Sequence, residues 1–600
     1  MENKLTYKLQ KGDDVVKSKM ARAKSSLGSF KEFYSYIKED KLRMFASFVL
    51  IVIGASSSIF TPYFIAKIID RYIASGNITG LGMVIVYLIL FYMFTSTIGY
   101  FQQQNLGAVS QRTLFRLREA LFLKLQNLPI AFFTQNKAGD LMSRINNDTE
   151  KLNNFLSQTL ARLASQSFVI CGIGIFLLYI NTKLALVMLA SVFVLVIITS
   201  GLSPTLEKLT KRFLQSIGAL SASLQENIFN FRVIIAFNKR AYFKKQVSDS
   251  TEAVFRAGFK SNTLNKIFEP IYDLASGIAL ASVIWYGLHL VSVGEITVGV
   301  LIGFMIYTQQ FYDPLRTLAT LFSNVQQSLA SWSRIRDVLG LTSNLKILPY
   351  HSSSENLAHN AHFIQIRNVS FKYEESGQIL ENINLVFDKG RTYALVGPTG
   401  GGKSTLASLL ARLFDPTEGE ILIEGVDIRT FNHAHLAKKI GVILQDPILF
   451  TGTVAENIKY GNEEFSEYTD TDMEKILIER GFSDVLKRFE KGLSTTVSQN
   501  SGTGLSLGQK QLISFMRAVL RQPELLILDE ATANIDTITE NFLNESLNKL
   551  PADTTKIIIA HRLNTIKEAD EIMFVNGHHV VKAGDFHEAV SLIEKAKRNS

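Results

Sequence analysis

The 600-residue sequence predicts an α-helical transmembrane domain with six spans, followed by a soluble α/β domain built around a phosphate-binding loop. Three observations lead to this prediction. Long uncharged apolar runs fill the first half of the chain, the composition becomes that of a soluble α/β protein near residue 362, and a glycine-rich loop separates strand-like from helix-like residues near residue 400. The expected order is a disordered cytosolic tail, a transmembrane domain, a linker and a nucleotide-binding domain, at residues 1–28, 29–335, 336–361 and 362–594.

The N-terminal residues do not have the pattern of a signal peptide. They are polar and rich in lysine, with no apolar core before a small-residue cleavage site. Residues 29–41 mix charged and aromatic side chains, which is typical of an amphipathic helix lying on the membrane surface. The one cysteine, Cys171, lies in an apolar run, so no disulfide can form within the chain and no oxidising compartment is implied.

Six segments are long enough, or nearly so, to cross a membrane. A spanning helix needs about 20 largely apolar residues. None of the six contains Lys, Arg, Asp or Glu, and they cover residues 44–66, 81–101, 163–180, 184–206, 274–293 and 296–312. The last is the shortest, and we expect its helix to continue beyond Asp313.

Two long connections, residues 102–162 and 207–273, carry most of the basic residues of this half. The short loops on the other side hold little beyond Arg71 and Lys183. The positive-inside rule therefore places the long connections and both termini in the cytosol. Their helical spacing of leucines indicates spanning helices that extend into the cytosol. This distribution explains much of the formal charge of +9 through the membrane, so we expect no nucleic-acid partner.

Polar and aromatic residues of the spans leave two interpretations open. Glu269, Asp273 and Asp313 lie at cytosolic helix ends, where an acid is either functional or simply solvated. Aromatic side chains such as Phe91 and Trp285 suit a cavity for lipids or amphipathic drugs, and equally suit ordinary packing between helices.

The glycine-rich loop has the pattern of a phosphate-binding site. Strand-like residues 392–396 precede it and helix-like residues 405–413 follow it. Glycines let the backbone wrap phosphates with its N–H groups pointing inward, at the positive end of a helix. In such a loop Lys403 reaches the β- and γ-phosphates and the Ser404 hydroxyl binds Mg²⁺. The predicted ATP-binding residues here are Gly397, Pro398, Thr399, Gly400, Gly401, Gly402, Lys403, Ser404 and Thr405.

A second acidic motif ends the apolar run 525–528, where Asp529 and Glu530 follow one another. Two acids at a strand end are sometimes only solvated. With a phosphate-binding loop upstream, we expect Asp529 to hold the Mg²⁺ shell and Glu530 to polarise the attacking water.

The residues between these two motifs carry a family resemblance. Leu505-Ser506-Leu507-Gly508-Gln509 resembles the signature sequence of ABC ATPases. The resemblance implies that two such domains sandwich two ATP molecules. Each ATP then meets the loop of one chain and the signature of the other, here Ser506, Gly508 and Gln509.

Other short motifs match the same family in order. The resemblance implies that Tyr373 stacks on adenine, and that Gln445 senses Mg²⁺ as a ligand and contacts the membrane domain. It also implies that Asp536 lies in a loop crossing the dimer interface and that His561 contacts the γ-phosphate. Glu530, His561 and Gln445 are therefore the expected catalytic residues.

The membrane half is similar to the exporters of this family. Residues 128–133 and 139–148 look like their first cytosolic hairpin, and residues 226–237 look like the second coupling helix. Importers generally keep the two halves on separate chains, so this fusion favours export.

The signature departs from the family pattern. Leu507 stands where glycine is usual, and a side chain there would restrict the approach of the backbone to a phosphate. The usual glutamate near Asn500 is also missing. An altered signature beside an otherwise intact site resembles one subunit of a heterodimeric exporter. A homodimer that tolerates Leu507 is the rival.

The resemblance implies ATP-driven export of a small amphipathic molecule, a lipid or a peptide by alternating access. We expect a multi-pass protein of the cell membrane, the inner membrane in a Gram-negative host, with ATP and Mg²⁺ as cofactors. Its expected partners are a second half-transporter and membrane lipids. The alternatives are a homodimeric lipid flippase and an ATP-gated channel or regulatory receptor on the same fold, which uphill substrate movement would distinguish from export.

Overall fold

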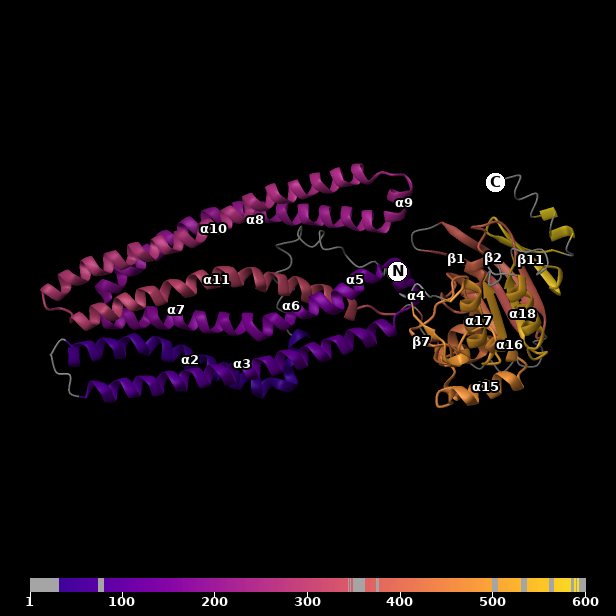
Figure 1. Cartoon of the computed structure of the whole chain (residues 1–600), viewed down its shortest axis with the longest axis horizontal. Helices are drawn as coiled ribbons and strands as arrows, with labels where there is room; N and C mark the ends of the chain where they lie inside the picture. Colours follow the sequence, from indigo (N-terminus) through magenta and orange to yellow (C-terminus); the bar gives the residue numbers. More distant parts are fainter. Residues whose placement is uncertain are drawn as a thin grey trace. The chain divides into compact units, whose positions relative to one another are not determined.

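The computed structural model in Figure 1 describes most of the chain. The described residues are 32–73, 80–343, 345, 347–348, 362–373, 377–498, 505–529, 537–560, 566–583, 587–589 and 591–592. They divide into a helical unit, residues 32–126 and 138–340, and an α/β unit, which holds the residues from 341 onward together with Asn127–Lys137. The N-terminal tail expected at residues 1–28 lies outside the described residues.

The helical unit consists of long helices joined by short turns (Figure 1). Several helices that follow one another in the chain run side by side, as α2 with α3 and α8 with α10 do. The helices are α2 (Lys41–Ile68), α3 (Leu81–Gln126), α5 (Ala138–Ser143), α6 (Thr149–Asn154), α7 (Leu160–Ile180), α8 (Thr182–Phe229), α9 (Phe231–Ala236), α10 (Arg240–Ser292) and α11 (Val298–Leu339). A short helix, α4 (Ile130–Gln135), belongs to the α/β unit.

Five helical stretches of the described residues are long and apolar enough to cross a membrane. They contain the first four predicted spans and all of the fifth except its last residue, Val293. They cover Glu32–Ile73, Leu81–Gln126, Ala138–Ile180, Thr182–Phe229 and Arg240–Ser292. The sixth predicted span is also helical, because α11 begins at Val298 and continues past Asp313 as expected. Its apolar part is not among the five, so the count of six spans stays a prediction.

A shared core joins five of the long helices. Ile173 of α7, Leu184 of α8, Ala279 and Val283 of α10 and Phe304 of α11 are all buried in it, together with residues of α2. The Tyr307 hydroxyl of α11 donates a hydrogen bond to the Ile59 carbonyl of α2 at 2.6 Å. A free hydroxyl in this apolar core would be costly, and the bond therefore fixes α11 against α2.

The expected amphipathic segment before the first span is helical over residues 32–37, and part of its apolar face packs on protein. Phe33 and Ile37 are buried, and the Phe33 ring lies 5.0 Å from the Trp332 ring of α11. The alternation of aromatic and charged residues is the same for a face turned to lipid and a face turned to protein. In the structure, Phe33 of this face packs on α11, and the position of the helix on the membrane surface stays a prediction.

Two buried carboxylates form ion pairs with arginines of α3 and α11. Asp148 accepts hydrogen bonds from the Arg334 guanidinium of α11, at 2.8 Å from Nε, and from the Ser331 hydroxyl. Asp40 is paired with Arg112 and Arg116 of α3. Burial by itself raises the pKa of the Asp40 carboxyl, but the hydrogen bonds from the two guanidinium groups outweigh it, and the pKa lies below its usual value.

The α8–α10 hairpin is packed against the other helices at one end only. The buried residues of α8 all lie before residue 196, at Leu184, Ala185, Met188 and Leu195. Further along, large apolar side chains such as Leu214, Phe255 and Phe259 are exposed. The helix α9 joins α8 to α10 at the far end of the hairpin (Figure 1).

The α/β unit contains two large sheets and a group of helices. Its elements are β1 (Ile364–Lys372), β2 (Gln378–Phe387), β3 (Thr392–Val396), α12 (Lys403–Leu410), β4 (Glu418–Ile423), β5 (Val426–Asp427), α13 (His433–Lys439), β6 (Ile440–Ile443), β7 (Gly452–Thr453), α14 (Val454–Lys459), α15 (Asp470–Glu479), α16 (Ser483–Leu486), β8 (Thr496–Val497), α17 (Leu507–Val519), β9 (Leu525–Asp529), α18 (Thr537–Asn548), β10 (Thr555–Ile559), β11 (Glu571–Asn576) and β12 (His579–Ala583).

The larger sheet positions the candidate site. Its strand order is β12-β11-β3-β10-β9-β6, and all pairs except β11–β12 are parallel. Asp529 at the end of β9 is level with Ile559 of β10, which is level with Leu395 of β3. The carboxyl ends of parallel strands form one edge, where ligands of open α/β sheets bind.

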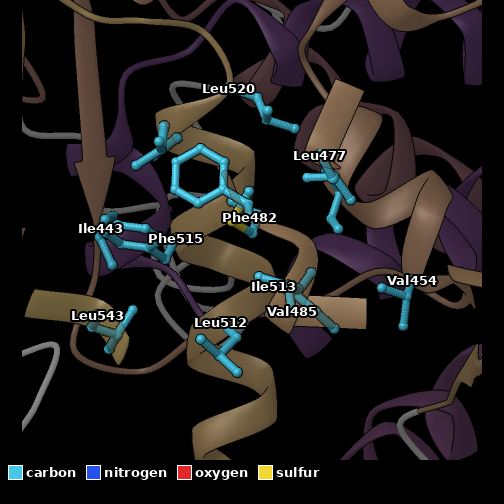
Figure 2. Close-up of a cluster of buried hydrophobic side chains, with 14 of the residues drawn as sticks. Ile443, Val454, Leu477, Phe482, Val485, Leu512, Ile513, Phe515, Leu520 and Leu543 are labelled. Atoms are coloured by element: carbon cyan, nitrogen blue, oxygen red, sulfur yellow. The ribbon is translucent and has the colours of Figure 1, made fainter. Parts of the chain in front are cut away.

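The helices of the α/β unit enclose a separate apolar core (Figure 2). Leu512, Ile513 and Phe515 of α17 lie in its centre, near Ile443 at the end of β6 and Leu543 of α18. The apolar side of α17 is therefore turned to the core, and its N-terminus, where the predicted signature lies, is held at the edge of this core.

Candidate functional site

The glycine-rich loop needs glycine at several positions. Gly397 has φ +147°, and a Cβ there would lie 2.0 Å from the Val575 carbonyl oxygen. Gly402, with φ +103°, precedes the first residue of α12, where the left-handed backbone favours glycine. The loop therefore passes tightly over β11 and delivers the following residues to the N-terminus of α12.

Lys403 lies folded back on its own loop. Its ammonium group donates hydrogen bonds to the carbonyl oxygens of Gly397, at 2.8 Å, and Pro398, at 2.9 Å. The side chain is 6% exposed. These contacts hold the loop in its curved shape and place the ammonium charge beside it, where the charge can attract an anionic phosphate.

Ser404 and Asp529 meet across the edge of the sheet. The Ser404 hydroxyl donates to a carboxylate oxygen of Asp529 at 3.3 Å, although 125 residues separate them in the chain. A hydroxyl and a carboxylate are oxygen ligands of the kind that Mg²⁺ prefers. The structure thus brings together two of the three residues predicted to bind the ion.

Tyr373 lies beside the same helix. Its hydroxyl is 3.2 Å from the Thr405 hydroxyl, and its ring meets the rings of Phe371 and Phe414 edge-on at 4.9 and 5.4 Å. The ring is therefore oriented by two aromatic neighbours next to the loop, which agrees with a role at the base of a nucleotide.

The third predicted Mg²⁺ residue, Gln445, is exposed just after β6, the strand next to β9. Its backbone carbonyl accepts a hydrogen bond from the Gln511 amide of α17 at 2.7 Å. Arg517 of α17 donates to the Ile448 carbonyl of the same segment at 2.9 Å. The helix that begins at the signature therefore holds the backbone that carries Gln445.

The signature residues form the N-terminal cap of α17. The Ser506 hydroxyl accepts from the Gln509 N–H, and the Gln509 side chain accepts from the Ser506 N–H at 2.8 Å. Gly508 is buried, while Leu507 is 39% exposed. The cap fixes the first turn and presents the Leu507 side chain on the surface.

Three predicted site residues fall on parts of the chain for which no structure is described. Glu530 follows β9 directly, His561 follows β10 after one residue, and Asp536 precedes α18. Their assigned roles remain predictions.

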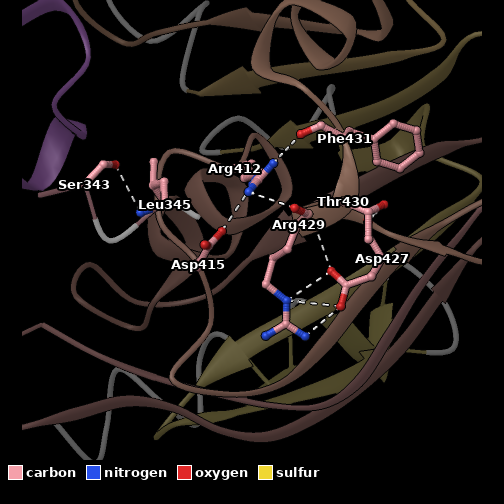
Figure 3. Close-up of polar contacts among 8 residues, drawn as sticks. All are labelled: Ser343, Leu345, Arg412, Asp415, Asp427, Arg429, Thr430 and Phe431. Atoms are coloured by element: carbon pink, nitrogen blue, oxygen red, sulfur yellow. Dashed lines mark hydrogen bonds and ion pairs between the residues drawn. The ribbon is translucent and has the colours of Figure 1, made fainter. Parts of the chain in front are cut away.

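Arg412 secures the far end of α12 (Figure 3). Its guanidinium is almost fully buried and donates to the carbonyls of Phe431, at 2.7 Å, and Arg429, at 3.2 Å, and to Asp415. Burial raises the pKa of the Asp415 carboxyl, and Arg412 offsets part of that effect. The linker residue Leu348 donates its N–H to the same Arg429 carbonyl, so the linker is attached at this point.

The sequence patterns did not single out Gln511, Arg412 or Arg517. The sequence does contain one sign that Gln511 is buried. It is a polar residue on the apolar face of α17, beside Leu512 and Phe515. Such a buried amide needs a hydrogen-bond partner. The partner is a backbone group far away in the sequence, and no pattern in the sequence names it.

Comparisons with known proteins identify the family. Residues 44–315 match the model of the ABC transporter transmembrane region, and residues 380–533 match the ABC transporter model. The chain is 34% identical over 575 residues to the uncharacterized ABC transporter ATP-binding protein YfiC of Bacillus subtilis, covering 95% of this chain and 94% of that one. The chain belongs to the ABC transporters.

Two further relatives of this transporter have descriptive names. The chain is 30% identical over 559 residues to an ATP-dependent lipid A-core flippase of Syntrophus aciditrophicus, with 92% and 91% of the two chains covered. It is 27% identical over 566 residues to a multidrug resistance ABC transporter of Lactococcus lactis, with 94% of each covered. The protein is an exporter-type half-transporter and a multi-pass membrane protein with a cytosolic ATP-binding domain, and its ATPase is coupled to transport.

The site fits the ATP and Mg²⁺ of this transporter family. The close approach of Gly397 to the Val575 carbonyl fixes the tight course of the loop, and Lys403 supplies a positive charge there. Ser404 and Asp529 offer adjacent oxygen ligands for the ion. When bound, Mg²⁺ neutralises charge on the phosphates, while these residues position it.

A groove lies beside the segment that follows Gln445. Its volume is about 430 Å³, and its lining includes Leu444, Pro447 and Ile448 together with Arg412, Arg517 and Arg521. The Arg517 guanidinium stands 5.3 Å from the Tyr460 ring, which also lines the groove. A groove lined by apolar side chains and Tyr460 suits a short helix with exposed aromatic residues.

Proposed function

We propose that this chain is half of a dimeric exporter that uses ATP hydrolysis to move a small amphipathic molecule, lipid or peptide across the membrane by alternating access. The contact between Ser404 and Asp529 is the observation that supports it most. It provides two adjacent oxygen ligands beside the Lys403 loop, in a chain whose other unit holds, among its described residues, five helical stretches apolar enough to span a membrane.

We assign the following roles at the ATP site. Lys403 and the backbone of residues 397–405 hold the phosphates, while Ser404, Asp529 and Gln445 hold Mg²⁺. Glu530 polarises the attacking water, and His561 contacts the γ-phosphate. Tyr373 stacks on the adenine, and its two aromatic neighbours hold it in place for this.

The partner chain completes the site in this proposal. Ser506, Gly508 and Gln509 of one chain face the phosphates bound by the other, and Asp536 lies in the interface. Two observations support a dimer. The far part of the α8–α10 hairpin leaves large apolar residues uncovered, and the cap of α17 presents Leu507 on the surface.

The partner is proposed to be a different half-transporter. A leucine at the third signature position keeps the backbone farther from a phosphate than glycine would, which impairs the ATP site that receives this signature. The loop of this chain would meet an unaltered signature on the partner. In a homodimer, both sites would receive Leu507. The homodimeric arrangement remains the alternative, and the flippase relative supports lipid transport in either case.

Closure of the ATP-binding domains is proposed to reach the membrane through α9. This helix is flanked by Phe229 and Phe237, which are 88% and 72% exposed. We propose that α9 docks in the groove beside Gln445 on the partner's ATP-binding domain. The hydrogen bond from Gln511 to Gln445 would then link that groove to the signature helix.

Purifying the chain alone and together with its partner tests the heterodimer. The ATPase rate of the lone chain in lipid nanodiscs is expected to be at least about tenfold below that of the co-expressed pair, because each site then lacks an unaltered signature. Leu507→Gly is expected to raise the rate of the lone chain. Full drug-stimulated turnover by the lone chain would refute the heterodimer and leave the homodimer.

A further inference from the structure

A pocket of about 360 Å³ lies between the C-terminal end of α2 and the start of α3. Its residues on α2 and the following turn include Phe64, Lys67 and Arg71, and those on α3 include Tyr87, Leu88 and Phe91. It is separate from the ATP site and from the groove beside Gln445.

The hydrogen bonds of Asp70 place this pocket at the outer side of the membrane. The Asp70 carboxylate accepts from the Thr297 hydroxyl at 2.6 Å and from the Gly299 N–H at 2.8 Å. The C-terminal end of α2 therefore lies at the N-terminal end of α11. The other end of α11 leads to the cytosolic ATP-binding domain, so the pocket opens where α2 and α3 reach the outer leaflet.

The pocket combines positive charge with an apolar wall. Lys67 and Arg71 are four residues apart on one side, and none of the described residues that line the pocket is acidic. The Lys67 ammonium lies 4.9 Å from the centre of the Tyr63 ring, and the Arg71 guanidinium lies 6.0 Å from the Tyr72 ring. Lys67 and Arg71 line the same pocket as Phe64 and Phe91, whose rings are 6.4 Å apart.

The backbone changes its winding at this point. Residues Ile69–Ile73 form a π-helical turn, and this turn carries Asp70, Arg71 and Tyr72. The turn follows directly on the end of α2 at Ile68. Here the turn directs Asp70 to α11 while Arg71 and Tyr72 line the pocket.

We propose that this pocket binds an anionic amphiphile from the outer leaflet. The acidic head, a phosphate or a carboxylate, pairs with Lys67 and Arg71, and the apolar chain lies on Phe64, Leu88 and Phe91. Basic residues near helix ends commonly extend to the interface without binding anything. That behaviour needs no cavity, whereas these two cations border one of a size typical of ligand sites. The proposal does not depend on which molecule is exported.

Lipid retention by the full-length chain tests the proposal. Native mass spectrometry would measure the binding of dioleoyl-phosphatidylglycerol, oleate, dioleoyl-phosphatidylcholine and inorganic phosphate to the purified protein in detergent. We expect the phosphatidylglycerol and oleate to bind more tightly than phosphatidylcholine, and inorganic phosphate not to compete, since it lacks the apolar chain. Lys67→Gln with Arg71→Gln should weaken the binding of both amphiphilic anions about tenfold or more.

Two further variants separate the effect of charge from the effect of the cavity. Lys183→Gln removes another basic residue of the outer surface, outside the pocket, and is expected to leave binding unchanged. Leu88→Trp fills the pocket with both cations intact and should also weaken binding about tenfold. Equal retention by the wild type and the Lys67/Arg71 variant, an equal loss in Lys183→Gln, or competition by free phosphate would overturn the proposal. The ATPase rate, measured in parallel, reports separately on the proposed function.

Discussion

One hydrogen bond, from Gln511, connects the signature helix to the segment that carries Gln445. Its amide holds the carbonyl of Gln445, and so a residue of the signature helix fixes the segment that carries a proposed Mg²⁺ ligand. Loss of this bond would leave the Gln445 segment free to move while the phosphate loop, which Lys403 holds separately, stays formed.

We therefore expect Gln511→Leu to lower the ATPase kcat about fivefold, the equivalent of about 1 kcal/mol for one hydrogen bond. The dissociation constant for ATP should change little, because the phosphate loop is intact. Lys510→Met, the neighbouring change on the same helix, serves as the control. An equal fall in both variants, or a large loss of ATP affinity in Gln511→Leu, would contradict this role.

Asp40 predicts a pH dependence of stability. Its folded-state pKa lies below the ordinary value, so its pairing with Arg112 and Arg116 stabilises the fold above about pH 4 and is lost as the pH falls through the folded pKa. Asp40→Asn should melt below the wild type at pH 7, and this difference should shrink below about pH 4. Glu39→Gln, at the exposed neighbour, should show no such dependence in thermal unfolding at a series of pH values. A constant difference would show that the carboxylate charge is not what stabilises the fold.

Sequence reasoning at this scale located the glycine-rich loop between a strand and a helix, as the structure has it. The loop from Gly397 to Ser404 is predictable because its strand, glycines and helix are contiguous. Gln511 and Arg412 also bond to backbone carbonyls of Gln445 and Phe431, which lie 66 and 19 residues away, and a carbonyl leaves no trace in residue type.

The helices were the most predictable elements, since an uncharged run of membrane length leaves few alternatives. Hydropathy located five stretches that the structure shows as long apolar helices, and α11 continues beyond Asp313 as expected. The contact between Phe33 and Trp332 was not predictable, because a helix that is apolar on one face has the same sequence pattern whether that face packs on lipid or on protein.

The pair formed by Asp148 and Arg334 is the element-scale contact most open to test. Asp148 is buried, and Arg334 of α11 is one of the groups that neutralise it. Arg334→Met leaves a buried carboxylate with less compensation and should destabilise the helical unit by about 3 kcal/mol, measured by thermal or chemical unfolding in detergent. Asp148→Leu combined with Arg334→Met should recover most of this loss. A single variant as stable as the wild type would show that the pair does not hold α11.

At the scale of the whole molecule, the two units have the parts of an ATP-driven exporter. The α/β unit provides the phosphate loop and the Mg²⁺-binding edge, and the helical unit provides apolar helices with an incompletely covered hairpin. The sequence predicted this division from the change in composition near residue 362. It does not identify the partner, because the exposed apolar side chains of the α8–α10 hairpin show an uncovered surface without naming what covers it.

Uphill transport in proteoliposomes tests the central claim most directly. The chain, with its partner where one is required, would be reconstituted with its ATP-binding domain outward and given a fluorescent amphipathic cation or a headgroup-labelled phospholipid. We predict ATP-dependent accumulation against the gradient that Lys403→Met abolishes, while Glu530→Gln binds ATP and traps a closed dimer with little turnover. Passive flux that is equal with and without ATP, or accumulation that persists in Lys403→Met, would contradict the account.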